Sequence, residues 1–163
     1  MNKILFTVFF FVVNIFAETD NHSRKNILGD TTTDILFKQY PIFKSKYKSY
    51  EVNTMYDLSI IRDMDFVIMF GTWCHDSKRE VPRMLRILDL AGVSLEQISL
   101  IGVDINKEEP KGREKIYNLK NTPTLIFLKN GEEVGRIIER PKISLEADLI
   151  SLMTRSLEPV VED

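Results

Sequence analysis

The stretch GTWCHDSKREVP, residues 71–82, contains the only tryptophan and the only cysteine of the 163-residue chain, Trp73 and Cys74. The stretch directly follows the apolar run DFVIMF, residues 65–70. A Trp-Cys pair in this position is typical of a redox site, and such sites usually carry a second cysteine three positions later. Ser77 occupies that position here. The sequence therefore raises the question of what one thiol does where a pair is expected.

Three apolar runs predict the strands of a sheet. They lie at residues 65–71, 97–105 and 122–128, and each has the length of a strand. A continuous apolar run of this length is typical of a strand that is buried on both faces.

Helical patterns and one turn signal lie between and after these runs. Apolar residues recur at helical spacing from Cys74 to Gly92, a short helix is expected near residues 114–119, and residues 143–157 have the pattern of an amphipathic helix. The pair Asn130-Gly131 signals a tight hairpin turn. Alternating strands and helices predict an α/β fold whose sheet has a parallel portion and an antiparallel hairpin edge.

Residues 31–63 are expected to form a helical extension before the first strand. A threonine at its start can cap a helix, and Pro41 should end or bend that helix. A second helix is expected up to Tyr50, and Asn53 or Thr54 can cap a third.

The N-terminus predicts export. Lys3 precedes an apolar run from residue 4 to residue 17, which is too short for a comfortable membrane span and suits a secretory signal peptide. We therefore expect a signal peptide at 1–17, a loose leader at 18–30 and a periplasmic or extracellular protein without stable membrane association. The alternative is an uncleaved N-terminal anchor.

Composition excludes several function classes. Hydrophobic residues make up 44% and charged residues 28% of the chain, which fits a globular protein with one domain. The net charge of −2 gives no basic surface of the kind that binds nucleic acid. His22 and His75 lie far apart, so we expect no metal site, and no sequence motif calls for a cofactor.

Three features in the right order resemble the thioredoxin family. The segment WCHDS stands where that family carries Trp-Cys-x-x-Cys, and Pro82 lies where the family kinks its active-site helix. The segment NTPTLIFLKNGEEVGRI is similar to the family's cis-proline strand and hairpin, with Pro123 as the cis-proline. The resemblance covers residues 64 to about 155. It implies a three-layer α/β/α domain at 64–158 with a mixed central sheet. The extension at 31–63, followed by the segment GTWCHDSKREVPRM, also resembles an exported bacterial branch that carries Asp and Ser after the cysteine.

Two departures from the family pattern concern the second sulfur. Ser77 replaces the resolving cysteine, and Ile68 stands where many thioredoxins carry a buried aspartate that is associated with proton transfer to that sulfur. The absence of the aspartate is consistent with the absence of the second cysteine, because an aspartate that transfers protons to that sulfur is not needed when the sulfur is missing. The two departures put full dithiol turnover in doubt.

Cys74 is nevertheless expected to react. It should lie at a helix N-terminus, where free backbone N–H groups and the helix dipole favour a thiolate. Trp73, His75 and Ser77 are its expected supporting residues, whereas the charge of Asp76 should oppose ionisation.

Other interpretations of the same residues stay open. His75 can be a solvent-facing neighbour, residues 78–80 are expected to form a solvated face, and Cys74 itself can be a buried, inert residue. The resemblance gives Thr122 and Pro123 a substrate-binding role, in which the Thr122 backbone beside Cys74 pairs with an extended substrate.

The resulting prediction is a thiol–disulfide oxidoreductase with one active cysteine. A lone thiolate can form a mixed disulfide, and release then needs a second substrate thiol or an external small thiol. The expected partners are therefore protein or low-molecular-weight thiols and disulfides, in isomerase-type or deglutathionylation-type chemistry. The alternative is a non-enzymatic module that binds extended or cysteine-containing polypeptides. A one-cysteine peroxidase is less favoured, since further Thr and Arg residues of peroxidase branches are missing around Cys74.

Overall fold

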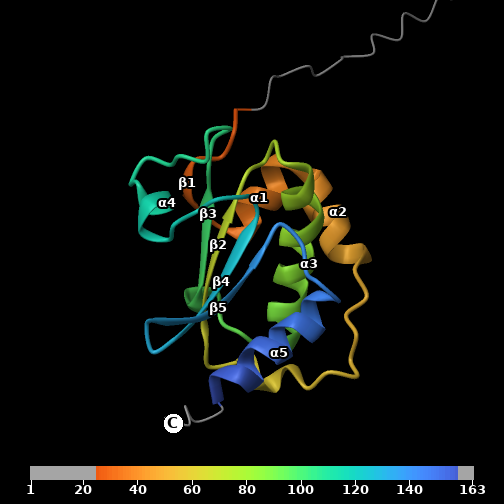
Figure 1. Ribbon diagram of the computed structural model, residues 1–163. Helices are drawn as coiled ribbons and strands as arrows, with labels where there is room; N and C mark the ends of the chain where they lie inside the picture. Colours follow the sequence, from red (N-terminus) through yellow and green to blue (C-terminus); the bar gives the residue numbers. More distant parts are fainter. Residues whose placement is uncertain (1–24, 158–163) are drawn as a thin grey trace, which may run out of the picture.

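The computed structural model describes residues 25–157, which form a mixed five-stranded sheet in the order β1-β3-β2-β4-β5 (Figure 1). The strands are β1 (Gly29–Thr31), β2 (Asp65–Phe70), β3 (Ile98–Gly102), β4 (Thr124–Lys129) and β5 (Glu132–Ile138). The helices are α1 (Thr33–Gln39), α2 (Pro41–Ser49), α3 (His75–Ala91), α4 (Arg113–Ile116) and α5 (Leu145–Leu157), with 3-10 turns η1 (Leu58–Ile61) and η2 (Leu95–Gln97). The predicted signal peptide and residue 158 lie outside the described residues.

The sheet is built around β2, which pairs with a neighbour on each edge. Strand β3 is parallel to β2, and the connection between them contains α3. The other pairings, β1 with β3, β2 with β4 and β4 with β5, are antiparallel. The predicted parallel portion and hairpin edge are therefore confirmed.

Helices cover both faces of the sheet, which gives the predicted α/β/α layering. Helices α2, α3 and α5 lie over one face and the single turn α4 lies over the other (Figure 1). Alternate residues of β2 enter the two cores: Phe66, Ile68 and Phe70 face the α3 side, whereas Val67 and Met69 face the α4 side. This period-2 alternation explains why the whole run had to be apolar.

Helix α3 begins and ends where the sequence predicts. Cys74 is its N-cap, and Gly92 is its C-cap with a left-handed φ of 76°, a conformation that favours glycine. Pro82 lies inside the helix and is buried.

Two N-terminal elements differ from the sequence-based expectation. Gly29 and Asp30 were expected to end a loose leader and Thr31 to begin the helical extension, but these three residues form strand β1 at the edge of the sheet. The chain comes close to β3 just before this strand, because a Cβ atom at Gly102 would lie 2.3 Å from the carbonyl oxygen of Ile27. The expected third helix is only the short turn η1, with Asp57 rather than Asn53 or Thr54 as its cap. The sheet thus includes residues upstream of the expected boundary at 64.

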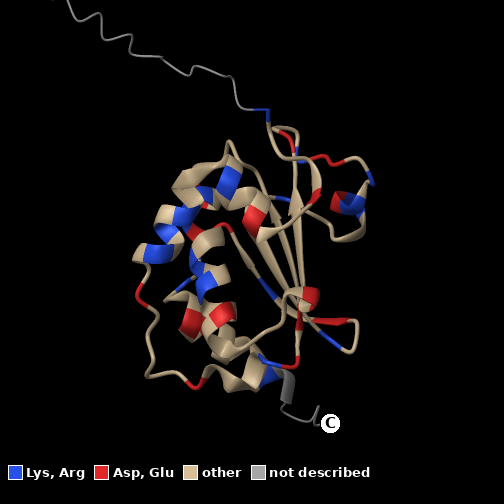
Figure 2. Cartoon of the chain, turned by 180° about the vertical axis from the view of Figure 1, so that it is seen from behind, with Lys and Arg blue, Asp and Glu red and all other residues tan. Residues whose placement is uncertain are grey.

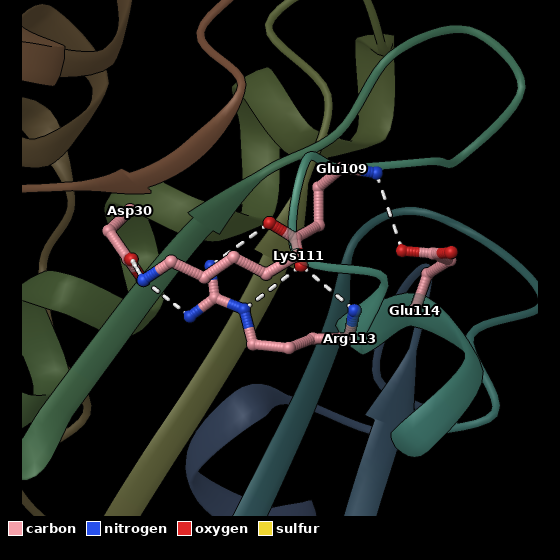
Figure 3. A network of polar contacts seen from close by, with 5 residues as sticks. All are labelled: Asp30, Glu109, Lys111, Arg113 and Glu114. Atoms are coloured by element: carbon pink, nitrogen blue, oxygen red, sulfur yellow. Dashed lines mark hydrogen bonds and ion pairs between the residues drawn. The ribbon is translucent and has the colours of Figure 1, made fainter.

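A network of charged side chains holds β1 against the segment before α4 (Figure 3). Arg113 binds both carboxylate oxygens of Glu109, at 3.0 and 3.1 Å, and also binds Asp30. Lys111 adds a second contact to Asp30 at 2.6 Å. The hydrogen bonds from Arg113 outweigh the burial of Glu109 and lower the pKa of its carboxyl to about 2.

Replacing Glu109 by Gln should therefore destabilise the fold in a pH-dependent way. A carboxyl whose pKa is lowered by folding contributes stability above its unfolded pKa of about 4.3, and this contribution is lost as the pH falls towards 2. We expect a loss of about 1–2 kcal/mol at pH 7 that shrinks between pH 4.5 and 2. Urea denaturation at several pH values measures it. The exposed neighbour Glu108, replaced by Gln as a control, should change stability little; equal losses for both variants would contradict the role of the network.

Candidate functional site

Cys74 lies where β2 ends and α3 begins. The Cys74 N–H donates to the carbonyl oxygen of Gly71 at 3.0 Å, which closes the turn between the two elements. The Cys74 carbonyl oxygen accepts the first helical bond, from Lys78 at 3.1 Å. The Ser77 N–H points at the sulfur, with an N–Sγ distance of 3.5 Å. The half-buried thiol therefore takes the place of an N-cap side chain and accepts from a free helix donor.

The start of β4 lies directly against this thiol. The Thr122–Pro123 peptide bond is cis, as the sequence predicts. The Cys74 S–H donates to the carbonyl oxygen of Thr122 at 3.1 Å, although 48 residues separate the two in sequence. The fold thus brings together three residues that the sequence assigned to one site.

The surroundings of Cys74 favour its ionised form. Burial raises the pKa of the thiol, but hydrogen bonds from the Thr122 and Ser77 side chains and from the backbone N–H groups of Ser77 and Asp76 outweigh burial and lower the pKa below its ordinary value. Thr122 affects both the thiol and the thiolate of Cys74. Its side chain stabilises the thiolate, whereas its carbonyl oxygen accepts a hydrogen bond from the protonated thiol. That bond is lost on ionisation, so it opposes the lowering without reversing it.

Ser77 fills the position of the missing sulfur and is fully buried. Its hydroxyl oxygen accepts a hydrogen bond from the backbone N–H of Gly71 at 3.2 Å. Ile68, which stands in place of the family's buried aspartate, is buried as well, with 1% of its surface exposed. Ser77 therefore links the end of β2 to α3 in addition to contributing to the thiol's surroundings.

The other two predicted supporting residues, Trp73 and His75, have no hydrogen bond to the Cys74 sulfur among the contacts of residues 25–157. Trp73 lies over the turn and donates from its indole nitrogen to the carbonyl oxygen of Val103 at 3.2 Å. Its ring lies so close to Gly71 that a Cβ atom there would be 2.5 Å from it. His75 is exposed and makes no hydrogen bond or ion pair with the residues described here, so its supporting role stays a prediction.

The expectation that residues 78–80 form a solvated face is wrong for Glu80. Its side chain is 2% exposed and contacts Arg79 and Arg83, while its second carboxylate oxygen, Oε2, has no hydrogen-bond partner within residues 25–157. Arg79 also binds the carboxylate of Asp76, with 2.6 Å between Nη2 and Oδ1. Arg79 therefore neutralises the charge that was expected to oppose the thiolate. No sequence pattern singled out this arginine.

The N-terminal segment also reaches the site, which the sequence did not indicate. The Thr72 hydroxyl donates to the side-chain oxygen of Asn26 at 3.1 Å. The Tyr40 hydroxyl donates to the carbonyl oxygen of Lys25 at 3.0 Å. The helical extension, the segment before β1 and the turn at residues 71–74, which we call the active-site turn after its predicted role, are therefore connected by direct contacts.

Neither a metal site nor a membrane-spanning helix is found among residues 25–157. No cluster of three or more His, Cys, Asp or Glu side chains in this range has the arrangement of a metal site. None of the helices in the described range combines the length and the apolar character that crossing a bilayer requires.

Comparison with known proteins identifies the family. No protein-family model matches the chain. The chain is 30% identical over 80 residues to the thioredoxin of Chlamydia trachomatis, and the match covers 49% of this chain and 72% of that protein. This chain belongs to the thioredoxin family. It is also 27% identical over 83 residues to thioredoxin H9 of Arabidopsis thaliana, where the match covers 51% of this chain and only 55% of that thioredoxin.

Solved structures similar to this thioredoxin-family chain include two of different kinds. One is a Fasciola hepatica thioredoxin, at 21% identity and a TM-score of 0.40, covering 60% of this chain and 84% of that one. The other is a Pseudomonas aeruginosa protein of unknown function, at 17% identity and a TM-score of 0.49, covering 80% of this chain and 82% of that one.

The lowered pKa of Cys74 predicts the pH profile of its alkylation. Only the thiolate reacts with iodoacetamide, so the rate should rise with pH through a midpoint below that of a free cysteine, about 8.5. Replacing Ser77 by Ala removes its hydroxyl while leaving its backbone donor, and should move the midpoint upward. A wild-type midpoint at or above 8.5 would contradict an activated thiol. Circular dichroism checks that the variant is folded, because the Gly71 N–H loses its acceptor.

Proposed function

We propose that this thioredoxin-family protein is a thiol–disulfide oxidoreductase that works through mixed disulfides on a single cysteine. The observation that carries the proposal is the position of the Cys74 sulfur, between the free N–H groups of α3 and the Thr122 backbone. The lowered pKa of Cys74 supports it, because the thiolate is the attacking form. The chain contains no other cysteine, so an internal disulfide is excluded.

The reaction begins with attack on a substrate disulfide. The Cys74 thiolate forms a bond to one substrate sulfur while the bond between the two substrate sulfurs breaks. The second substrate sulfur leaves as a thiolate and takes up a proton from solvent. The product is a mixed disulfide between Cys74 and the substrate.

Release must come from outside the protein. In isomerisation, another thiolate of the same substrate attacks the mixed disulfide, a new substrate disulfide forms and Cys74 leaves as a thiolate with no net oxidation. In deglutathionylation, Cys74 attacks the glutathione sulfur and frees the protein thiol. A second glutathione then attacks, so that glutathione disulfide forms and Cys74 is regenerated.

The backbone beside the thiol supports binding of an extended polypeptide. Thr122 precedes β4, and its carbonyl oxygen contacts Cys74 instead of another strand. An extended substrate that pairs with this backbone would bring its sulfur next to Cys74, in the manner of strand addition. We propose Thr122 and Pro123 as the substrate-binding residues on this ground.

We also propose that the protein is exported, on the basis of Lys3 and the apolar run that follows it. N-terminal sequencing of the protein from fractionated cells should find a mature chain that begins near Glu18 outside the cytoplasm. Recovery of an intact Met1 in the membrane fraction would favour the uncleaved anchor.

Placing a cysteine at position 77 should convert the one-thiol site into a two-thiol site. Position 77 lies one helical turn after Cys74, and its backbone nitrogen is 3.5 Å from the sulfur, so a thiol there is within reach of a disulfide. We expect Ser77→Cys to form an internal disulfide and to raise turnover of insulin reduction roughly tenfold or more. Mass spectrometry of alkylated protein and the insulin assay measure the two effects.

Two further variants control this experiment. Ser151→Cys adds a thiol at an exposed position of α5 and should leave insulin reduction unchanged. Cys74→Ala should abolish mixed-disulfide formation and turnover. If Cys74→Ala keeps full binding of extended peptides and the wild type shows no thiol exchange, the protein is a binding module instead of an enzyme.

A further inference from the structure

One side of the molecule, along α1 and α2, carries an excess of positive charge. Lys38 of α1 and Lys44, Lys46 and Lys48 of α2 are all exposed, and Figure 2 shows basic residues gathered along α2 and the adjoining part of α3. We call these four residues the lysine face. None of them forms an ion pair with the part of the chain that the structure describes. Residues 33–50 include only one acidic residue, Asp34, in a chain of net charge −2.

The exposed residues Asp34 and Glu51 lie close to the lysine face in sequence, whereas the acidic side chains of α3 are already paired or buried. Helix α3 packs against α2, and its carboxylates are bound by arginines of the same helix: Asp76 by Arg79 at 2.6 Å and Asp89 by Arg86 at 3.0 Å. Glu80 is buried. The acids of α3 therefore do not cancel the charge of the lysines, and the lysine face differs from a surface of alternating charges.

The lysine face lies on the elements that adjoin the active-site turn. The ring of Phe43 in α2 contacts that of Phe70, with 5.9 Å between centroids, and Phe70 is four residues before Cys74. At the start of α2, Tyr40 is bonded to Lys25, whose neighbour Asn26 is bonded to Thr72 of the turn. A further cation, Lys78, donates to the carbonyl oxygen of Trp73 at 3.3 Å. The lysine face therefore begins near this turn and extends along α3, because Tyr47, which lies between Lys46 and Lys48, contacts Arg86 and Asp89 near the other end of α3.

We propose that the lysine face attracts acidic polypeptide segments of the disulfide substrates on which Cys74 acts. The proposal rests on the proposed function and specifies its substrate class. Lysine is a compact charge on a flexible stem, so these residues suit steering of carboxylates better than fixed, bidentate recognition. Their effect is therefore on the rate of encounter, which opposite charge raises and salt reduces.

Two peptides that differ only in charge test the proposal. Each carries one cysteine as a mixed disulfide with uncharged 2-mercaptoethanol, flanked by four Glu residues in one peptide and by four Gln residues in the other. At low salt we expect the acidic peptide to form the Cys74 adduct about tenfold faster. Quenching with acid and intact-mass analysis give the two rate constants.

Matched lysine variants locate the effect. Replacing Lys44, Lys46 and Lys48 together by Gln should bring the two rates to within about twofold, as should 0.5 M sodium chloride. Replacing Lys107, Lys115 and Lys129 by Gln removes the same charge away from α2 and should keep the preference. Reaction with bis(2-hydroxyethyl) disulfide, which is uncharged, should be equal in all variants and reports on the thiol itself.

The possible failures are distinguishable. Equal rates for both peptides in the wild type overturn the docking surface but leave the proposed function standing. No adduct with either peptide or with the uncharged disulfide overturns the proposed function. Loss of the preference in the control variant as well assigns it to overall charge and overturns the lysine face. The protein can also be mixed with phosphatidylglycerol vesicles. If it binds them through the three α2 lysines and shows no preference between the peptides, the lysine face binds an anionic membrane, and the proposal of a polypeptide partner is overturned.

Discussion

The contact between the Cys74 sulfur and the Thr122 carbonyl oxygen is the constraint on which the site depends. It joins the N-terminus of α3 to the start of β4, two points 48 residues apart, at a distance of 3.1 Å. The order of the strands makes this contact possible, because β4 pairs directly with β2, and β2 leads into the turn before Cys74. The sheet, the helix start and the backbone before β4 therefore form one structural unit.

A serine at position 77 changes the chemistry of this unit more than its structure. The hydroxyl oxygen satisfies the Gly71 N–H and keeps the end of β2 bound to α3. The fold therefore does not need a second sulfur at this place. What is lost is the internal thiol that would release a bound substrate. In the proposed mechanism, the wild-type protein holds its mixed disulfide until another thiol attacks it, and this makes an external thiol part of the proposed reaction.

Local patterns were sufficient to predict the central strands and the main helix, whereas the three-layer arrangement was implied by the family resemblance. The apolar run of β2, the Asn130-Gly131 turn and Gly92 at the end of α3 each reflect a short-range rule, and each lies where it was expected. The family resemblance added the cis bond before Pro123 and its position beside Cys74, which spacing alone does not give. The short edge strand β1 was missed because three residues are too few for a periodic pattern, and pairing with β3 decides their conformation.

The electrostatics of the site were harder to predict because they depend on side chains from several elements. Glu80 was expected in solvent, but it is buried, and burial depends on tertiary packing rather than on its neighbours in sequence. Asp76 was expected to oppose ionisation, and its ion pair with Arg79 could not be inferred from spacing alone, since many such pairs on a helix surface do not form. The bond between Asn26 and Thr72 joins segments that carry no motif.

The central claim, that one thiol forms a mixed disulfide and cannot release it unaided, is tested most directly by intact-mass analysis of the wild-type protein. The reduced protein is mixed with one equivalent of a glutathionylated peptide that contains no other cysteine, and samples are quenched with acid over time. The account predicts an adduct on Cys74 that persists until reduced glutathione is added and then disappears. No adduct at any time, or an adduct of equal size on the Cys74→Ala variant, would contradict it.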